Sequence, residues 1–419
     1  MNAAIPALFD ADSSMPEGWG KQNLSTLAAV EKNAVVGGPF GSDLVSKDYT
    51  PSGVPVIRGQ NMGEKFVGND FVYVSNEKAK SIWANTAKPN DIIFTQRGTL
   101  GQVSIVPIRP YPRYVISQSQ MKITLDKRKC DPFYIWHFFN STQQQQVILS
   151  SAIQTGVPHI NLKIMREFSV SVPPLPEQQA IATALNDIDD LIASLDALIA
   201  KKRDIKQAAM QQLLTGNTRL PGFEEEWKVA KLSQIAKIQR GASPRPIDSP
   251  KWFDDNSSIG WVRISDVTRS GIKLTETTQR LSAAGIQHSR FVPNGSLIMS
   301  ICATIGRPII TSLDVCIHDG FVVFDELKVE KDFLYFVLKN IEGEWSKMGQ
   351  TGSQMNLNTG MINGKEISLP VDRDEQAAIA KIALDMEAEI IALQSKEHKA
   401  RTLRRGMMQQ LLTGRIRLV

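Results

Sequence analysis

The chain has 419 residues, more than one ordinary domain needs, and 42% of them are hydrophobic. That content supports sizeable cores and excludes an intrinsically disordered protein. The formal charge of +5 permits binding to nucleic acid without requiring it. Residues 1–155 carry a slight basic excess and residues 222–355 carry none, so any DNA contact in the second half must come from local placement of charge.

The cysteines and the N-terminal residues indicate the compartment. Cys130, Cys302 and Cys316 form no paired framework, which is typical of a reducing cytoplasm. Met1–Asp10 lacks the basic head and long apolar core of a signal peptide. Since no apolar stretch is long enough to cross a bilayer, we expect a soluble cytoplasmic protein.

The first segment, residues 1–160, contains short apolar runs bounded by Gly, Pro and Asn, such as Asp91–Phe94. This pattern predicts a β-rich mixed domain. Residues 131–139 predict a short helix with an aromatic face, capped by Asp131 and opened by Pro132. The same residues invite comparison with the Asn/Asp-Pro-Pro-aromatic loop of amino-methyltransferases, but the second proline is missing and the capped helix is the favoured interpretation.

The second segment, residues 161–221, predicts a long helix that Pro176 opens and Gly216 ends. Its apolar residues alternate in spacings of 4 and 3, a heptad seam that requires a partner helix. The seam comprises Ile181, Leu185, Ile188, Ile192, Leu195 and Ile199.

Residues 374–418 repeat residues 175–220 at one constant offset without a gap. Each copy has Glu-Gln near its start and Met-Gln-Gln-Leu-Leu-Thr-Gly near its end, where Gly414 is the second predicted cap. A seam on the same register comprises Ile379, Ala383, Met386, Ile390 and Leu393.

The third segment, residues 222–358, echoes the first one faintly, and residues 359–419 form the C-terminal spacer region. Ser296–Met299 predicts a buried strand, and residues 331–338 predict a second aromatic helix. The chain is therefore arranged as domain, helix, domain, helix.

The predicted fold class is α+β. Two β-rich mixed domains are expected in a pseudo-two-fold arrangement, separated by the two long helices packed as an antiparallel coiled coil. The alternative is that each helix packs on its own globular domain. A paired helix of some forty residues is about 60 Å long at about 1.5 Å per residue, and would hold the two domains at a fixed spacing.

Several sequence runs, in the same order in both halves, resemble the target-recognition domains of type I restriction-modification DNA specificity subunits. The runs in the first half are Gly37–Ser42, Gly53–Asn61 and Gln96–Gln102, and those in the second are Ser243–Pro246, Ser300–Gly306 and Cys316–Gly320. The run Pro173–Gln179 opening a helix that ends in Leu213–Gly216 is similar to the central spacer of that family.

The resemblance implies a subunit without activity of its own that binds double-stranded DNA. It implies two modification subunits as partners, which supply S-adenosylmethionine and methylate adenine, and restriction subunits that use ATP and Mg²⁺. No cofactor or metal is expected in this chain, and no membrane contact. Each domain would read one half of a bipartite target, while the helices form the spacer and a docking surface.

Reading bases requires side chains that match base edges, such as Arg for guanine and Asn or Gln for adenine. The loops of both domains carry such residues, although a surface or turn-stabilising role is the alternative for each. The candidates are Arg58, Gln60, Asn61, Arg97, Thr99, Gln118 and Ser119 in the first domain, and Arg245, Arg263, Ser265, Asp266, Thr304, His318 and Asp319 in the second.

A metal site and two other classes of protein are the alternatives. Cys302, Cys316 and His318 suggest a metal site, but a fourth ligand and a Cys-x-x-Cys knuckle are missing. A self-contained methyltransferase or nuclease would need a methyl-donor motif or a carboxylate-lysine cluster, and neither is evident. A coiled-coil scaffold that binds no nucleic acid is the third possibility.

Overall fold

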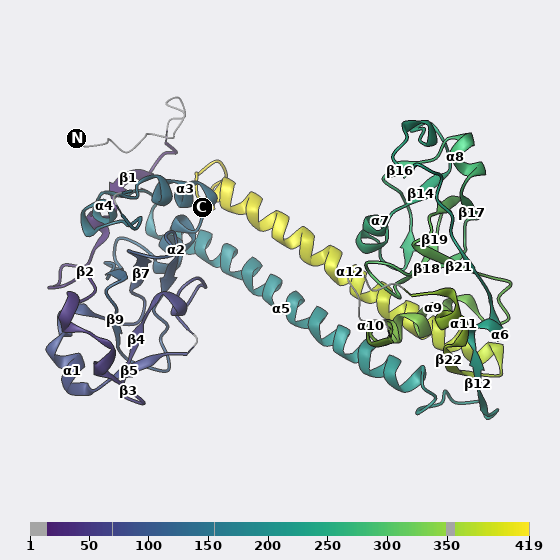
Figure 1. Cartoon of the computed structure of the whole chain (residues 1–419). Helices are drawn as coiled ribbons and strands as arrows, with labels where there is room; N and C mark the ends of the chain where they lie inside the picture. Colours follow the sequence, from purple (N-terminus) through teal and green to yellow (C-terminus); the bar gives the residue numbers. More distant parts are fainter. Residues whose placement is uncertain (1–14, 69, 155, 349–356, 419) are drawn as a thin grey trace. The chain divides into compact units, whose positions relative to one another are not determined.

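The computed structural model describes residues 15–68, 70–154, 156–348 and 357–418 (Figure 1). The chain divides into two compact units, one made of residues 1–196 and 396–419 and the other of residues 197–395. Met1–Asp10, the segment without signal-peptide features, lies outside the described residues. Among the described residues, no helix combines the length and apolar character needed to cross a membrane.

The first domain, in unit 1, is built on sheets whose strands follow the short apolar runs of the sequence. The first sheet has the order β2 (Val35–Gly37), β10 (Gln120–Ile123), β7 (Ile92–Thr95), β8 (Val103–Ile105). The second has the order β3 (Tyr49–Thr50), β5 (Val72–Val74), β4 (Val54–Ile57), β9 (Tyr114–Ile116), β6 (Thr86–Ala87). A small sheet pairs β1 (Gly20–Asn23) with β11 (Ser169–Val172).

The second domain, in unit 2, repeats this topology. Its first sheet has the order β13 (Lys237–Arg240), β21 (Phe321–Asp325), β18 (Leu297–Ser300), β19 (Pro308–Thr311), β15 (Lys273–Leu274). Its second has the order β16 (Gln279–Arg280), β14 (Gly260–Val262), β20 (Val315–Ile317), β17 (Arg290–Val292), and a small sheet pairs β12 (Trp227–Lys231) with β22 (Glu366–Pro370). Apart from β3 and β15, each strand has a counterpart in the other domain.

Short helices complete both domains. In unit 1 they are α1 (Asn76–Ser81), α2 (Pro132–Phe139), α3 (Thr142–Ser150) and α4 (Leu162–Glu167). In unit 2 they are α6 (Leu232–Ile235), α7 (Ile264–Arg269), α8 (Ala283–Gln287), α9 (Lys331–Asn340), α10 (Glu342–Met348) and α11 (Thr359–Gly364).

Helices α2 and α9 are the two predicted aromatic helices. The Asp131 side chain accepts hydrogen bonds from the backbone N–H groups of Phe133 and Tyr134, and Pro132 begins α2. Tyr134 is buried and donates its hydroxyl to the Ser171 carbonyl at 2.7 Å. The run Asp-Pro-Phe-Tyr is therefore a capped core helix, as predicted.

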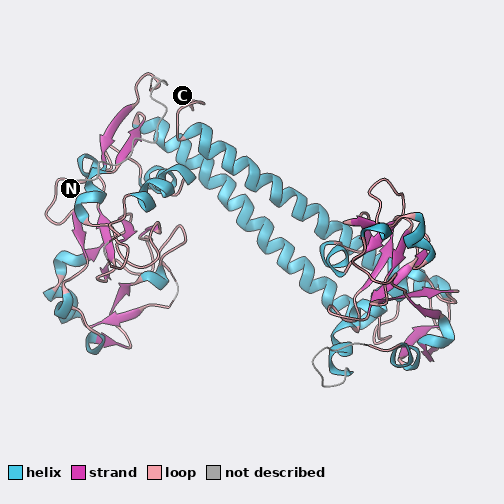
Figure 2. Cartoon of the chain, turned by 45° about the horizontal axis from the view of Figure 1, so that its top comes forward, coloured by secondary structure: helices cyan, strands magenta, loops and turns pink. Residues whose placement is uncertain are grey.

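The long helices α5 (Leu175–Leu213) and α12 (Arg373–Leu411) each pass through both units. Figures 1 and 2 both show them side by side. Within unit 1, a residue with a higher number on α12 pairs with a residue with a lower number on α5, so the helices run antiparallel. The ion pairs that show this are Asp196–Arg401 at 2.8 Å and Asp189–Arg404.

The same order holds within unit 2, where Lys202 pairs with Glu389 at 2.7 Å and Lys206 pairs with Glu387. With the mixed domains described above, this confirms the predicted α+β class and the antiparallel helix pairing. The Lys206–Glu387 pair of unit 2 and the Arg404–Asp189 pair of unit 1 occupy corresponding positions in the repeat.

The predicted seam lies inside the helix pair. Leu195, Met386 and Leu393 are half-buried, and the other predicted seam residues are buried. Ile188 and Ile192 cluster with Ala400 of α12. At their N-terminal ends the helices also pack on their own domains, where Ile181, Leu185, Ile379 and Ala383 join the main cores. The alternative prediction, that each helix packs on its own domain, is thus correct for the first turns of each long helix.

The start of α5 is tied to the far end of the chain by a buried carboxylate. Glu177 accepts hydrogen bonds from Nε and Nη2 of Arg417 at 2.6 and 2.8 Å and from the Trp19 indole at 3.1 Å. Burial opposes ionisation, but the hydrogen bonds from Arg417 and Trp19 outweigh it and lower the pKa of Glu177. Gly414 lies beside this contact with a φ of +71°, and an added Cβ would meet Pro16 at 2.4 Å.

The start of α12 has the same contact in unit 2. Glu375 accepts from Arg219 at 2.7 and 2.8 Å and from the Trp227 indole at 3.4 Å. Gly216, at a φ of +73°, would place a Cβ 3.0 Å from the Trp227 ring. The Glu-Gln pair that opens each repeat therefore has a structural role in anchoring the helix.

Candidate nucleic-acid interface

In the first domain, three candidate loops converge because β4 and β9 are parallel. Val56 lies opposite Val115 and Ile57 opposite Ile116, so the chain leaves both strands at the same edge of the sheet. The Ser117 amide then donates to the Ile57 carbonyl at 3.0 Å. Both Gln96 and Arg97 donate backbone N–H groups to Ser119, at 2.7 and 3.3 Å, which brings the third loop to this edge.

The loop after β4 is organised around Asn61. This side chain is 1% exposed, accepts from the Arg58 amide at 3.0 Å and donates to the Gly68 carbonyl at 2.8 Å. Arg58 is half-buried, with its guanidinium 6.0 Å from the Tyr49 ring centroid. Gln60 is exposed and donates to Asp70 at 3.0 Å. Asn61 therefore supports the loop, while Gln60 is accessible.

The other two loops of this domain present different surfaces. Arg97 and Thr99 are exposed, and neither side chain hydrogen-bonds to another described residue. Gln118 is half-buried and donates its amide to the carbonyls of Gly41 and Leu44, while Ser119 is half-buried. Arg97 and Thr99 can thus meet a ligand, whereas Gln118 also fastens the neighbouring segment.

The second domain brings its candidates together in the same way. Strands β14 and β20 are parallel, so the loops that follow them, beginning at Arg263 and His318, leave at one edge. The Ile301 amide donates to Gly320 at 2.8 Å, which places the 300–307 loop beside them. Thr304 in that loop is half-buried.

Asp266 is the counterpart of Asn61 in the loop after β14. It is 1% exposed and accepts from the Arg263 amide at 2.9 Å and the Arg269 guanidinium at 2.7 Å. Arg263 is half-buried, donates to Gln279 at 2.7 Å and lies 6.0 Å from the Trp261 ring centroid. Ser265 between them is exposed.

Arg245 is an exposed cation held by an acid from another loop. Its side chain is 71% exposed, and Nη2 lies 3.2 Å from the Asp319 carboxylate. Asp319 also accepts from the Ser243 hydroxyl; this hydrogen bond lowers the pKa of Asp319 against the effect of partial burial, and Arg245 lowers it further. An oriented, exposed guanidinium suits recognition of a guanine edge.

His318, the residue before Asp319, packs against the rings of Trp261 and Phe321. Burial lowers the pKa of His318 to about 4, against the opposing field of Asp319. Its Nδ1 accepts from the Gly320 amide at 2.9 Å. His318 is thus neutral at pH 7 and supports the loop from inside.

In each loop cluster, a glycine allows two backbone segments to approach closely. A Cβ on Gly38 would lie 1.9 Å from the Ser117 carbonyl oxygen, and one on Gly241 would lie 2.1 Å from that of His318. The two positions are equivalent, since each glycine follows the strand, β2 or β13, that pairs with β10 or β21.

One exposed residue at this edge is missing from the predicted candidates. Phe40 is 89% exposed and lies two residues after Gly38. The signal in the sequence is an aromatic residue in the turn-forming run Gly-Gly-Pro-Phe-Gly, without apolar neighbours to pack it.

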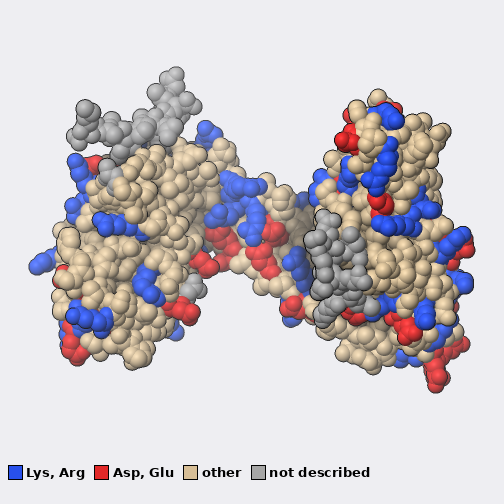
Figure 3. All heavy atoms as spheres, viewed as in Figure 1, with Lys and Arg blue, Asp and Glu red and all other residues tan. Residues whose placement is uncertain are grey.

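Charge at the surface is placed locally. On the face shown in Figure 3, Lys and Arg atoms gather over the part of unit 2 that carries α7 and β14, with acidic atoms among them. This agrees with the balanced composition of that half of the chain.

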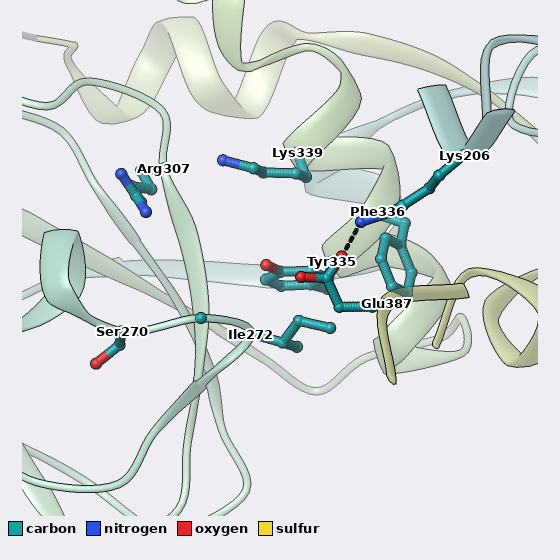
Figure 4. A pocket seen from close by; sticks show the side chains of 9 residues that line it. Lys206, Ser270, Ile272, Arg307, Tyr335, Phe336, Lys339 and Glu387 are labelled. Carbon is teal, nitrogen blue, oxygen red and sulfur yellow. Dashed lines mark hydrogen bonds and ion pairs between the residues drawn. The ribbon is translucent and has the colours of Figure 1, made fainter. Parts of the chain in front are cut away.

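A small cavity of about 140 Å³ lies in unit 2 (Figure 4). Lys206 reaches across it to Glu387, with Arg307 and Lys339 at its sides. None of the predicted base-contacting residues lines it. The cavity belongs to the junction of the domain with the long helices rather than to the loop cluster.

Comparison with known proteins agrees with this arrangement. Residues 41–201 and 224–400 match the family model for the type I restriction modification DNA specificity domain. The type I restriction enzyme MjaVIII specificity subunit of Methanocaldococcus jannaschii is 24% identical over 373 residues, covering 84% of each chain. The putative MjaX specificity subunit of the same organism is 21% identical and covers 96% of this chain and 95% of its own.

Solved structures share the fold. The S subunit of a type I restriction-modification system from M. genitalium superposes with a TM-score of 0.59 at 14% identity, covering 96% of this chain and 98% of that one. A chain from a structure described as showing complex assembly and conformational transition of the type I R-M system gives the same TM-score at 17% identity, covering 96% and 100%. With two matched domains spanning most of its length, the chain belongs to the family of type I restriction-modification DNA specificity subunits.

Proposed function

We propose that each domain reads one half of a bipartite DNA target through the loops at the edge of its parallel strand pair. The observation that carries this is the repeated geometry: equivalent backbone positions in both domains converge at one edge, with different side chains. Exposed Gln60, Arg97 and Thr99 serve the first half-site, and Arg245 and Ser265 serve the second. Different side chains on one scaffold are what two unlike half-sites require.

In this proposal Asn61, Asp266 and His318 support the loops from within and do not contact bases. The remaining candidates both support a loop and contact DNA. Arg58 and Arg263 each emerge from beside an aromatic ring, and Gln118 and Asp319 fasten the neighbouring segments. Thr304 and Ser119 are half-buried and would contact DNA after local adjustment.

The chain itself is proposed to be a non-catalytic cytoplasmic subunit. Two modification subunits would supply S-adenosylmethionine and methylate adenine, and restriction subunits would supply ATP- and Mg²⁺-dependent translocation and cleavage. Purified chain incubated with DNA, labelled methyl donor and Mg²⁺ is expected to give neither methylation nor cutting. Turnover by the chain alone would favour the self-contained enzyme.

The experiment that tests DNA reading is methylome sequencing of a host that expresses the chain with its modification subunit, followed by binding to the mapped target. We expect one split motif, and affinity for it that falls steeply with salt. Equal affinity for unrelated DNA, or none, would favour a scaffold that binds no nucleic acid in a sequence-specific way.

We also propose that the paired helices set the gap between half-sites, because both run without a break from one unit into the other. Leu195 and Leu393 are equivalent seam positions. One heptad inserted after each lengthens both helices by about 10 Å, close to three base pairs at about 3.4 Å each. The mapped gap should grow by about that amount, and an unchanged gap would refute this role.

A further inference from the structure

We propose that Phe40 contacts the 5-methyl group of a thymine and so specifies one T·A pair in the half-site of the first domain. This inference rests on the proposed function and names one base of the half-site and the residue that contacts it. It starts from the 38–44 segment, which lies beside the converging loops.

The 38–44 segment is fixed on both sides of Phe40. The Gly38 amide donates to the Gln120 carbonyl at 2.9 Å, and its Cα packs directly against Ser117. On the other side, the Gln118 side chain donates to Gly41 and Leu44. Phe40 is therefore held within the loop cluster by its neighbours and does not need contacts of its own to stay there.

The two large apolar residues of the 38–44 segment differ strongly in burial. Leu44 is 2% exposed and packs in a core with Val56 and Val115, whereas Phe40 is 89% exposed. A phenylalanine kept in water forgoes the stabilisation that burial would provide. Its exposure on a fixed segment is explained if a ligand covers it.

The equivalent segment of the second domain indicates the kind of ligand by the residue that it displays. It follows Gly241 and carries Arg245, which Asp319 holds in place. Asp319 and Gln118 occupy equivalent positions after β20 and β9, and each fastens the segment beside it. One segment thus displays a guanidinium and the other displays a benzene ring, at the edge where base-reading residues collect.

Base chemistry assigns different targets to these groups. A guanidinium matches the two acceptors of guanine, whereas a ring without donors or acceptors matches the thymine methyl group, the apolar feature of the major groove. A DNA ligand therefore explains the exposure of Phe40 and that of Arg245 together.

The test uses the complex of the full chain with its modification subunit and the mapped target. Each thymine of one half-site is replaced in turn by deoxyuridine, which removes the methyl group alone. Wild-type complex should lose roughly fourfold in affinity at one position, the value for one buried methyl group. Phe40→Ala should bind the thymine target about tenfold or more weakly, and should no longer distinguish thymine from deoxyuridine at that position.

Two variants serve as controls. Phe40→Leu keeps an apolar contact and should retain part of the preference for thymine. Val30→Ala removes a side chain that is 91% exposed but lies near the opposite end of the same sheet, where Ala29 bonds to Thr124. It should bind like wild type, and melting temperatures of the three variants should match because these side chains are not in a core.

Several outcomes would overturn the role of Phe40. These are an unchanged affinity of Phe40→Ala, an equal loss on thymine and deoxyuridine targets, or loss of the modification subunit from the complex, which would indicate a protein contact. If wild-type complex showed no preference for its mapped target over unrelated DNA, the proposed function itself would fall instead.

Discussion

The two units use the same side chains at the helix ends and different ones at the recognition loops. Glu177, Arg417 and Trp19 in unit 1 match Glu375, Arg219 and Trp227 in unit 2: each carboxylate accepts two hydrogen bonds from the arginine and one from the indole. At the loop edge the backbone path is shared, yet the residues on it differ. The comparison separates a scaffold, which requires fixed chemistry, from surfaces that can vary without disturbing it.

The largest expected effect tests whether the helix-end contacts are truly equivalent. Arg417→Ala or Arg219→Ala leaves a carboxylate that is at most 2% exposed without its partner, and should cost about 3 kcal/mol of unfolding free energy. Urea unfolding followed by tryptophan fluorescence, to which Trp19 and Trp227 contribute, measures it. Lys381→Ala, which breaks an exposed pair with Asp385, should cost at most about 0.5 kcal/mol. Strongly unequal losses in the two arginine variants would break the comparison.

The next effect concerns the shared backbone of the loop clusters. Gly38→Ala and Gly241→Ala each place a Cβ against a backbone carbonyl, so each should cost about 2 kcal/mol and disturb binding to one half-site. Gly59→Ala is the matched control, because it lies in the same cluster with open space around its Cβ. Wild-type stability in the Gly241→Ala variant would show that the close approach is not needed.

A smaller effect tests whether the readers are separate. The double variant Arg97→Ala with Gln118→Ala should weaken recognition at one half-site, and Arg245→Ala at the other, each by about 1–2 kcal/mol. Binding to targets mutated in one half at a time distinguishes them. Equal loss at both halves from either variant would contradict one reader per domain.

The smallest expected effect is a dependence of stability on pH in both units. Burial lowers the pKa of His137 and of His318 to about 4, below the ordinary value of 6.5. The unfolded chain therefore binds more protons between these values, and the unfolding free energy should fall as pH drops from 6.5 toward 4, by about 0.8 kcal/mol per histidine at pH 6.

The repeat supplies matched replacements for these histidines. His137→Phe introduces the residue found at the equivalent position, Phe336, and His318→Ser introduces that of Ser117. Each should remove its share of the pH dependence measured by urea unfolding at pH 7 and pH 6. A slope that survives both replacements would assign it to other groups.

The sequence predicts the helices and caps well because their signals are local. The heptad seam, the Asp131 cap and the aromatic helices all depend on neighbours within a few residues, and all are found. The convergence of the loops depends instead on which strands are parallel, which spacing along the chain does not reveal. Burial of Asn61 and Asp266 follows from that tertiary arrangement, although their position three residues after an arginine is a capping pattern.

Phe40 could not be selected by a search for hydrogen-bonding groups, because it has none. Its exposure is a property of the folded segment, created by Gly38 and Gln118 holding the chain on either side. Recognition of thymine by shape is thus harder to predict from sequence than recognition of guanine by charge.

The interlaced division of the chain bears on how the protein is made. Unit 2 is one continuous stretch, residues 197–395, whereas the core of unit 1 includes Met408, Leu411 and Leu412 from beyond it. During synthesis the second domain can thus complete its core first, and the first must wait for residues translated after it. A product truncated before Met408 would leave the apolar residues of that earlier core exposed to solvent.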